Sequence, residues 1–257
     1  MERIYTADNT KPAYQLNWGL TLFWRQTPIP DRDWLPELQE VTEADGVRVI
    51  KHQVTSHEAS QFFVSTTPDV SPPQLIRSIK GRLQHLIRQR LPKAFRRNYC
   101  LRSIGSATRE IVEEYVANQL GHHRMADPRA QERLAEFQKC FPRVDLSKPA
   151  FSAHGEYWYN LHLVIVNAER WMGIRHEVLR GLLDMVQKAA SKHAHRLSRV
   201  GLLADHLHLT LGCPIDQSPE EIALGYLNNC AYACGMKPVF RLSYYVATIG
   251  EYDRGAV

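Results

Sequence analysis

The stretch AFRRNYCLRSIG (94–105) has a counterpart later in the same chain, VFRLSYYVATIG (239–250). Upstream of each lies a second related pair, VSTTPDVSPPQLI (64–76) and LGCPIDQSPEEI (211–222). The matched residues are Asp69 and Asp216, Ser71 and Ser218, Pro72 and Pro219, Phe95 and Phe240, Tyr99 and Tyr244, Ile104 and Ile249, and Gly105 and Gly250. A period of about 146 residues is too long for a solenoid, so the pattern predicts a duplicated domain.

The composition is that of an ordinary globular protein. The chain has 257 residues, 44% of them hydrophobic and 23% charged, which is enough for a substantial core. Its five cysteines form no CxxC pair, which favours reduced thiols in an intracellular protein. The first residues, MERIYTADNTKPAYQ (1–15), lack the apolar segment of a signal peptide, and no long apolar run occurs elsewhere. We therefore expect a cytoplasmic protein that does not span a membrane.

Both halves predict the same succession of elements. In the first half the expected strands are 16–24, 46–54, 61–66 and 98–105. Three helices are expected there: one that ends before Gly46, one over 71–92 and one over 106–121. In the second half the expected strands are 157–166, 205–212 and 243–250, and the expected helices are 175–194 and 218–235. The fold class is therefore α+β: two copies of a small antiparallel sheet with helices packed on one face, related by a pseudo-two-fold axis. We expect the first copy at 1–146, ending in a connector helix, and the second at 147–257.

The second copy holds a pair of histidines that the first copy lacks. In DHLHLTLG (205–212), His206 and His208 stand two residues apart on a predicted strand, so both imidazoles point to one face. The matching places of the first copy hold Ala59 and Gln61, which cannot bind a metal in the same way. Asp205 precedes the pair and is a candidate to orient an imidazole by a hydrogen bond.

The first copy, in turn, keeps a helix that the second copy lacks. The predicted helix 106–121 carries Tyr115 and, four residues later, Gln119, which makes them neighbours on one helix face. After Gly250 only seven residues follow, so no equivalent helix is expected in the second copy. Each half therefore lacks what the other keeps.

The positive charge is concentrated in one part of the chain. From Leu75 to Arg109 there are ten Lys or Arg and no Asp or Glu, within a net charge of +5. A solvated surface normally mixes both signs, so this stretch favours a nucleic-acid partner over the alternative of a basic surface helix. The residues expected to contact phosphates are Arg77, Lys80, Arg82, Arg88, Arg96, Arg97 and Arg102.

In these motifs the chain resembles the single-tyrosine HUH transposases of small insertion sequences and their REP-associated relatives. The motifs are DHLHLTLG (205–212), SPPQLIRSIKGRLQHLI (71–87), YCLRSIG (99–105) with YYVATIG (244–250), and REIVEEYVANQ (109–119). The likeness extends over most of both halves. It implies ferredoxin-like sheets of the HUH type and an enzyme that nicks and joins single-stranded DNA during transposition and recombination.

The resemblance also implies a site. In that family two histidines and a glutamine hold a divalent cation, and a tyrosine attacks a phosphodiester to give a 5′-phosphotyrosine and a free 3′-OH. This implies Mg²⁺ or Mn²⁺ bound by His206, His208 and Gln119, with Tyr115 as the nucleophile. Because the family works as dimers, the chain would be a covalent pseudo-dimer with one composite site. It would act on DNA beside a hairpin and be associated with the nucleoid.

Other readings remain open from the residues alone. Tyr244, Tyr245 and Tyr252 are rival tyrosines, and a domesticated protein that binds hairpins without cutting is an alternative function. HLTL (208–211) also fits a two-histidine phosphoesterase, but the second motif that this chemistry needs is absent, since HQVT (52–55) and HRLS (195–198) have the hydroxyl one position too far.

Overall fold

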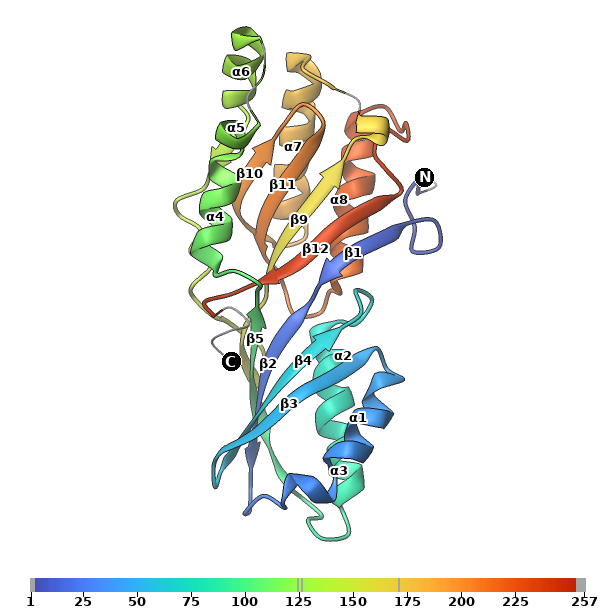
Figure 1. Cartoon of the computed structure of the whole chain (residues 1–257), viewed down its shortest axis with the longest axis vertical. Coiled ribbons are helices and arrows are strands. Elements are labelled where there is room, and N and C mark those ends of the chain that lie inside the picture. Colours follow the sequence, from blue (N-terminus) through green and yellow to red (C-terminus); the bar gives the residue numbers. More distant parts are fainter. Residues whose placement is uncertain (1–2, 124, 126, 171, 253–257) are drawn as a thin grey trace.

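The computed structural model describes residues 3–123, 125, 127–170 and 172–252, and it contains two six-stranded sheets (Figure 1). The first sheet has the order β3-β4-β2-β5-β8-β7 and the second the order β1-β12-β9-β11-β10-β6. The two sheets follow each other along the long axis of the molecule, with the helices at their sides (Figure 1). Within the described part of the chain, no helix is both long and apolar enough to cross a membrane.

Four adjacent strands of each sheet, with their helices, repeat one plan of strand, helix, strand, strand, helix, strand. In the first half these elements are β2 (Asn17–Trp24), α1 (Leu35–Glu43), β3 (Val47–Ser56), β4 (Ala59–Thr66), α2 (Pro72–Ile76) with α3 (Arg82–Ile87), and β5 (Phe95–Ile104). In the second half they are β9 (Asn160–Val166), α7 (His176–Lys192), β10 (Arg196–Leu202), β11 (His206–Gly212), α8 (Pro219–Ala233) and β12 (Ser243–Ile249). The expected α+β class is confirmed, and the strand order is the same in both halves, β3-β4-β2-β5 and β10-β11-β9-β12.

The whole sheets are mixed, whereas the sequence predicts antiparallel ones. The four repeated strands of each sheet pair in antiparallel fashion, but β1 (Lys11–Gln15) joins β12 in parallel and β8 (Gly155–Trp158) joins β5 in parallel. Two short strands, β7 (Ala150–Phe151) and β6 (Gln138–Cys140), complete the sheets at β8 and β10. The parallel pairs arise because β1 and β8 are not among the four repeated strands, and each pairs with a strand of the other half.

These two added strands are exchanged between the halves. β1 leads directly into β2 of the first sheet yet pairs with β12 of the second, and β8 leads into β9 of the second sheet yet pairs with β5 of the first. The division between 1–146 and 147–257 stays a prediction, but strands cross it in both directions. Backbone hydrogen bonds therefore tie each half to the other.

Reciprocal side-chain hydrogen bonds join the two halves where β5 and β12 end. The Ser103 hydroxyl donates to the carbonyl of Ile249, and the Thr248 hydroxyl donates to the carbonyl of Ile104, each at 2.6 Å. Ser103 and Thr248 hold matching places in the repeat and are both buried. This reciprocity is what a pseudo-two-fold relation between the copies produces.

Several element boundaries depart from the sequence prediction. The expected helix 71–92 ends at Ile87 and contains a π-helical segment, η2 (Arg77–Gly81), while Ser71 and Ser218 begin their helices in capping boxes. The expected helix 106–121 is divided at Asn118 into α4 (Arg109–Ala117) and α5 (Gln119–His122). The connector helix is α6 (Pro128–Ala135), and two short helices are η1 (Asp31–Asp33) and η3 (Ala168–Arg170).

Candidate active site

Strand β11, which carries the two histidines, is covered on both faces. All of its residues are buried, whereas buried and half-buried residues alternate along its counterpart β4. The leucines of β11 belong to the hydrophobic core, so His206, His208 and Thr210 point to the opposite face. Helix α4 covers that face by packing on β10 and β11 (Figure 1). A helix from the first half thus lies over the histidine strand of the second half.

Tyr115 lies beside the histidines on this covering helix. Its ring centroid is 5.7 Å from that of His208, with the rings nearly perpendicular. The side chain remains 40% exposed, so a ligand can reach it. The structure therefore brings together the tyrosine and the histidines that the sequence places in different halves.

Gln119 lies beneath the same helix, against a glycine. A Cβ atom on Gly201 would stand only 3.2 Å from Cγ of Gln119, and Gly201 is the register partner of His208 on the neighbouring strand. The Gln119 amide donates to the carbonyl of Tyr115 at 3.1 Å, although the helix breaks between them. Its Oε1 atom is buried and has no hydrogen-bond partner among the described residues. A buried carbonyl oxygen without a protein partner is a group that a water molecule or a cation can complete.

His206 is oriented by the preceding residue. Oδ1 of Asp205 lies 2.6 Å from Nδ1 of His206, and the other Asp205 oxygen accepts from Arg170 at 2.9 Å. With Nδ1 engaged, Nε2 is the ring nitrogen left for a metal. The role of Asp205 beside a metal stays a prediction.

A third histidine, His162 on β9, was missed by the sequence analysis. Its Nε2 atom lies 2.9 Å from Nδ1 of His208, and the planes of the two rings are inclined by only 16°, with centroids 5.2 Å apart. Tyr115 and Tyr245 both approach His162, with ring centroids at 6.4 Å and 6.0 Å. The available signal was the alternation of NLHLVIV (160–166), which puts a polar ring on an otherwise apolar strand.

Burial keeps these imidazoles neutral. It lowers the pKa of His208 to about 2 and that of His162 to about 4. Burial also lowers the pKa of His206, against the opposing effect of Asp205. Neutral imidazoles retain the lone pair that a metal ligand needs at neutral pH.

The donor set suits a divalent cation if the glutamine is included. Among the described residues, no group of three His, Cys, Asp or Glu is placed to hold a metal ion. Gln119 supplies a carbonyl oxygen without a hydrogen-bond partner among the described residues, and its side chain lies against Gly201, the residue opposite His208 on β10. Two imidazoles and one amide oxygen suit Mn²⁺ well and leave positions open for phosphate.

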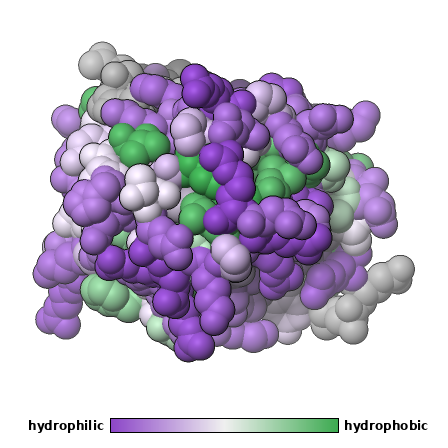
Figure 2. Space-filling view, turned by 90° about the horizontal axis from the view of Figure 1, so that it is seen from below, coloured by the Kyte–Doolittle hydropathy of each residue, from purple (hydrophilic) through white to green (hydrophobic). Residues whose placement is uncertain are grey.

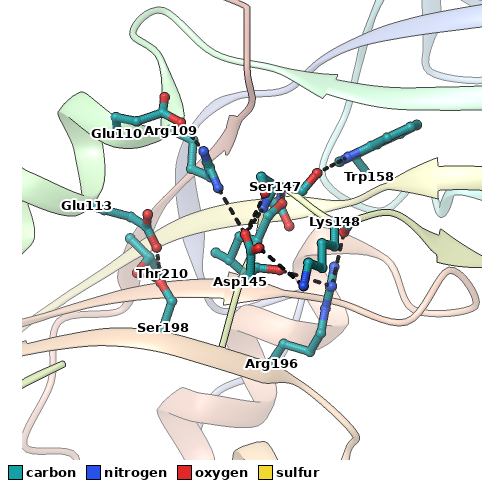
Figure 3. Close-up of polar contacts among 12 residues, drawn as sticks. Arg109, Glu110, Glu113, Asp145, Ser147, Lys148, Trp158, Arg196, Ser198 and Thr210 are labelled. Atoms are coloured by element: carbon teal, nitrogen blue, oxygen red, sulfur yellow. Dashed lines mark hydrogen bonds and ion pairs between the residues drawn. The ribbon is translucent and has the colours of Figure 1, made fainter. Parts of the chain in front are cut away.

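Polar contacts hold α4 against the second half (Figure 3). The Ser198 hydroxyl donates to the Glu113 carboxylate at 2.5 Å and lies 2.6 Å from the Thr210 hydroxyl. At the start of the helix, Arg109 pairs with Glu110 of the same helix and reaches Asp145, at the end of the first half, at 3.6 Å. These contacts fix the helix from which Tyr115 projects.

Several of the predicted phosphate-binding residues have partners within the protein. Arg82 pairs with Asp45 at 2.6 Å, and Arg96 pairs with Glu58 at 3.0 Å. Lys80 donates to the carbonyl of Arg97 at 2.9 Å, and burial lowers its pKa. The guanidinium of Arg102 lies 4.3 Å above the Trp158 ring, whereas Arg77 and Arg88 have no ion pair within the described residues. The end of the molecule seen from below is covered mainly by hydrophilic side chains (Figure 2).

The matching face of the first sheet is open. A groove there is lined by Gly19, Thr21, Lys51, Gln53, Gln61, Phe63, Cys100, Arg102, Ile104 and Tyr252. Gln61 occupies the place that His208 holds in the second half. The rival Tyr252 lines this groove, and the rival Tyr244 is buried.

The fold and this cluster are those of an α+β protein in which a tyrosine helix lies across a histidine strand. Over residues 35–119, about a third of the chain, the sequence matches the model of a family described as "Transposase IS200 like". The match begins at α1 and ends at Gln119, so it includes Tyr115 but not the histidines of β11. No curated protein sequence matches the chain.

Solved structures give weaker similarities. A REP-associated tyrosine transposase bound to a REP hairpin has 13% identity and a TM-score of 0.32, with 35% of this chain and 56% of that one covered. A protein of Deinococcus radiodurans R1 assigned as a transposase has 18% identity and a TM-score of 0.32, with 42% and 92% covered. This chain thus spans little more than half the length of the first of these proteins. TM-scores of this size do not establish a shared fold.

Proposed function

We propose that the protein is a metal-dependent enzyme that nicks and joins single-stranded DNA through a 5′-phosphotyrosine, with one composite site. The observation that carries the proposal is the approach of Tyr115, from the first half, to His208 of the second, with ring centroids 5.7 Å apart. The family match over residues 35–119 supports a transposase-like activity. The substrate we propose is a strand beside a DNA hairpin.

The proposed roles follow from the positions of the side chains. His206, His208 and Gln119 would hold Mn²⁺ or Mg²⁺, which acts as a Lewis acid on the scissile phosphate when bound. The Tyr115 oxygen would attack phosphorus, forming an O–P bond while the bond to the 3′ oxygen breaks and that oxygen takes up a proton. Because the ester keeps the bond energy, attack by a 3′-OH on the phosphotyrosine would rejoin strands without ATP.

Phosphate contacts would come from the basic stretch. Arg77 and Arg88 are exposed, and Arg102 presents a guanidinium held flat over Trp158. Arg82 and Arg96 keep exposed guanidinium groups beside their carboxylate partners. Lys80 and Arg97 complete the predicted set, and its positive charge favours a polyanion such as DNA.

Covalent trapping of DNA tests the proposal. A library of end-labelled single-stranded hairpins is incubated with Mn²⁺ and protein, and adducts are separated under denaturing conditions. We expect an adduct that disappears in Tyr115→Phe, because only the attacking hydroxyl is lost, while hairpin affinity is retained. The matched controls Tyr245→Phe and Tyr252→Phe should still form it.

Two other outcomes decide against the proposal. If hairpins bind but no variant or wild-type protein forms an adduct, the chain is the domesticated, non-cleaving binder. If the adduct survives Tyr115→Phe and disappears in Tyr245→Phe, the nucleophile is the tyrosine of β12 that also approaches His162.

A further inference from the structure

His162 has no role in the proposed chemistry, yet it lies at the centre of the site. It is 8% exposed, and its Nε2 atom is 2.9 Å from Nδ1 of His208. A hydrogen bond between two neutral imidazoles needs one protonated and one unprotonated nitrogen. The pair therefore has two arrangements, and they differ in what His208 offers to a metal.

The position of one proton decides whether His208 can be a ligand. If Nδ1 of His208 carries the proton and donates it to His162, Nε2 of His208 keeps its lone pair. If His162 donates instead, Nε2 of His208 is the protonated atom and cannot bind a cation. We propose that His162 is a positioning residue that accepts the hydrogen bond from Nδ1 of His208 and so keeps Nε2 of His208 available as a metal ligand. This inference rests on the proposed metal site.

The contact repeats what Asp205 does for the other histidine. Asp205 engages Nδ1 of His206 at 2.6 Å, and an ionised carboxylate can only accept a hydrogen bond. Both imidazoles of β11 would then be held at Nδ1 and would present Nε2. Such partners of metal-bound histidines fix the tautomer and the ring orientation.

The internal repeat gives an independent observation. His162 is the register partner of Thr210, and the corresponding pair in the first half is Gly19 with Phe63. A Cβ on Gly19 would lie 3.9 Å from Nε2 of Gln61, the residue that replaces His208. The copy with the histidine pair thus has the third histidine, and the copy without the pair has glycine there. A purely apolar packing role would not need an imidazole, since burying one requires a polar partner.

The tautomer can be read directly from the metal-free protein. Nitrogen-15 NMR of the histidine rings distinguishes protonated from unprotonated nitrogens. In the wild type we expect His208 to be protonated at Nδ1 only. His162→Leu should lose this preference, whereas His162→Gln should keep it because its amide oxygen can accept the same bond.

Manganese affinity gives the second readout, by titration of the free ion followed with electron paramagnetic resonance. His162→Leu should weaken Mn²⁺ binding by about 10- to 100-fold, as loss of such hydrogen-bond partners does. His162→Gln should retain most of the affinity. The control His195→Leu removes a histidine that bonds Tyr226 and Gln217 away from the site, so it should leave both readouts unchanged.

Three results would overturn the inference. The first is a wild-type His208 protonated at Nε2. The second is His162→Leu binding Mn²⁺ as tightly as the wild type, which would leave the proposed function intact. The third is a wild type that binds no Mn²⁺ at all, which would refute the proposed metal site together with the role of His162. Should His162→Leu fail to fold, the tautomer of His208 in the wild type and the Mn²⁺ affinity of His162→Gln still test the inference.

Discussion

His208 and His162 are 4% and 8% exposed, and burial is the first cause of their low pKa values, about 2 and about 4. An unfolded histidine titrates near 6.5. The folded protein therefore binds fewer protons than the unfolded chain at mildly acidic pH. At the scale of single residues, the burial that keeps both imidazoles neutral, and so able to bind a metal, also lowers the stability of the fold at acidic pH.

The metal-free protein should lose stability as the pH falls below about 6.5. Between that pH and about 4, the unfolded chain gains a proton at each ring while the fold keeps both rings neutral, so each contributes a loss of about 1.4 kcal/mol per pH unit. Above about 6.5 neither ring contributes. The free energy of unfolding, measured in urea at several pH values, should fall less steeply with decreasing pH for His162→Leu than for the wild type. Identical slopes would show that His162 is not held neutral by the fold.

At the scale of elements, the position of α4 depends on the absence of a side chain at Gly201. A Cβ on Gly201 would lie 3.1 Å from the carbonyl oxygen of Val116 and 3.2 Å from Cγ of Gln119. The first half has Gln53 at the matching place, opposite Gln61 as Gly201 is opposite His208. The glycine therefore lets a helix lie close to the second sheet, and the glutamine would keep one away from the first.

Gly201→Ala should displace α4 and lower the yield of the covalent DNA adduct more than hairpin affinity. Overpacking of this kind costs about 1–3 kcal/mol of unfolding free energy. Gly181→Ala in α7 is the matched control, since no atom lies within 4 Å of its added Cβ. We expect the control to be neutral or stabilising by up to about 1 kcal/mol. Equal adduct yields in the two variants would argue against close docking of α4.

The Glu113 contact should hold α4 in place. Glu113→Ala removes the acceptor of the Ser198 hydroxyl, so amide hydrogen exchange in α4 should become faster, with a stability cost of about 1–3 kcal/mol. Glu114→Ala, at the exposed neighbouring position, is the control and should leave exchange unchanged. If both variants exchange like the wild type, packing on Gly201 alone holds the helix.

At the scale of the whole molecule, strand exchange joins the halves. β1 and β8 each pair in parallel with the last core strand of the other half, next to the Ser103 and Thr248 hydrogen bonds. α4 crosses in the same sense, from the first half to the second sheet. The arrangement has the form of a two-fold dimer made from one chain. Among the described residues, the tyrosine-bearing helix follows only the first sheet's last core strand, and the histidine pair lies only on β11.

Mixing two inactive variants tests whether the proposed site forms within one chain. Tyr115→Phe lacks the nucleophile and His208→Ala lacks a ligand, so neither should form the DNA adduct alone. If helix and histidines come from one polypeptide, the mixture should remain inactive. Recovery of adduct on mixing would mean that the site is assembled between two chains.

The sequence alone determined the features that depend on local order. Matching residues such as Ser71 and Ser218, or Gly105 and Gly250, revealed the duplication, because turns and helix starts need particular residues at particular places. Strand alternation placed His206 and His208 on one face, and helical spacing placed Tyr115 near Gln119.

Only the tertiary structure decided which segments distant in the sequence lie in contact. The parallel pairing of β1 with β12 joins residues at opposite ends of the chain, and no local periodicity encodes such a pairing. The contact of His162 with His208 and the neutralisation of Arg82 by Asp45 likewise arise between distant segments. Neighbouring residues determine strand and helix, whereas the burial of an imidazole or the pairing of a charge depends on which segment folds against it.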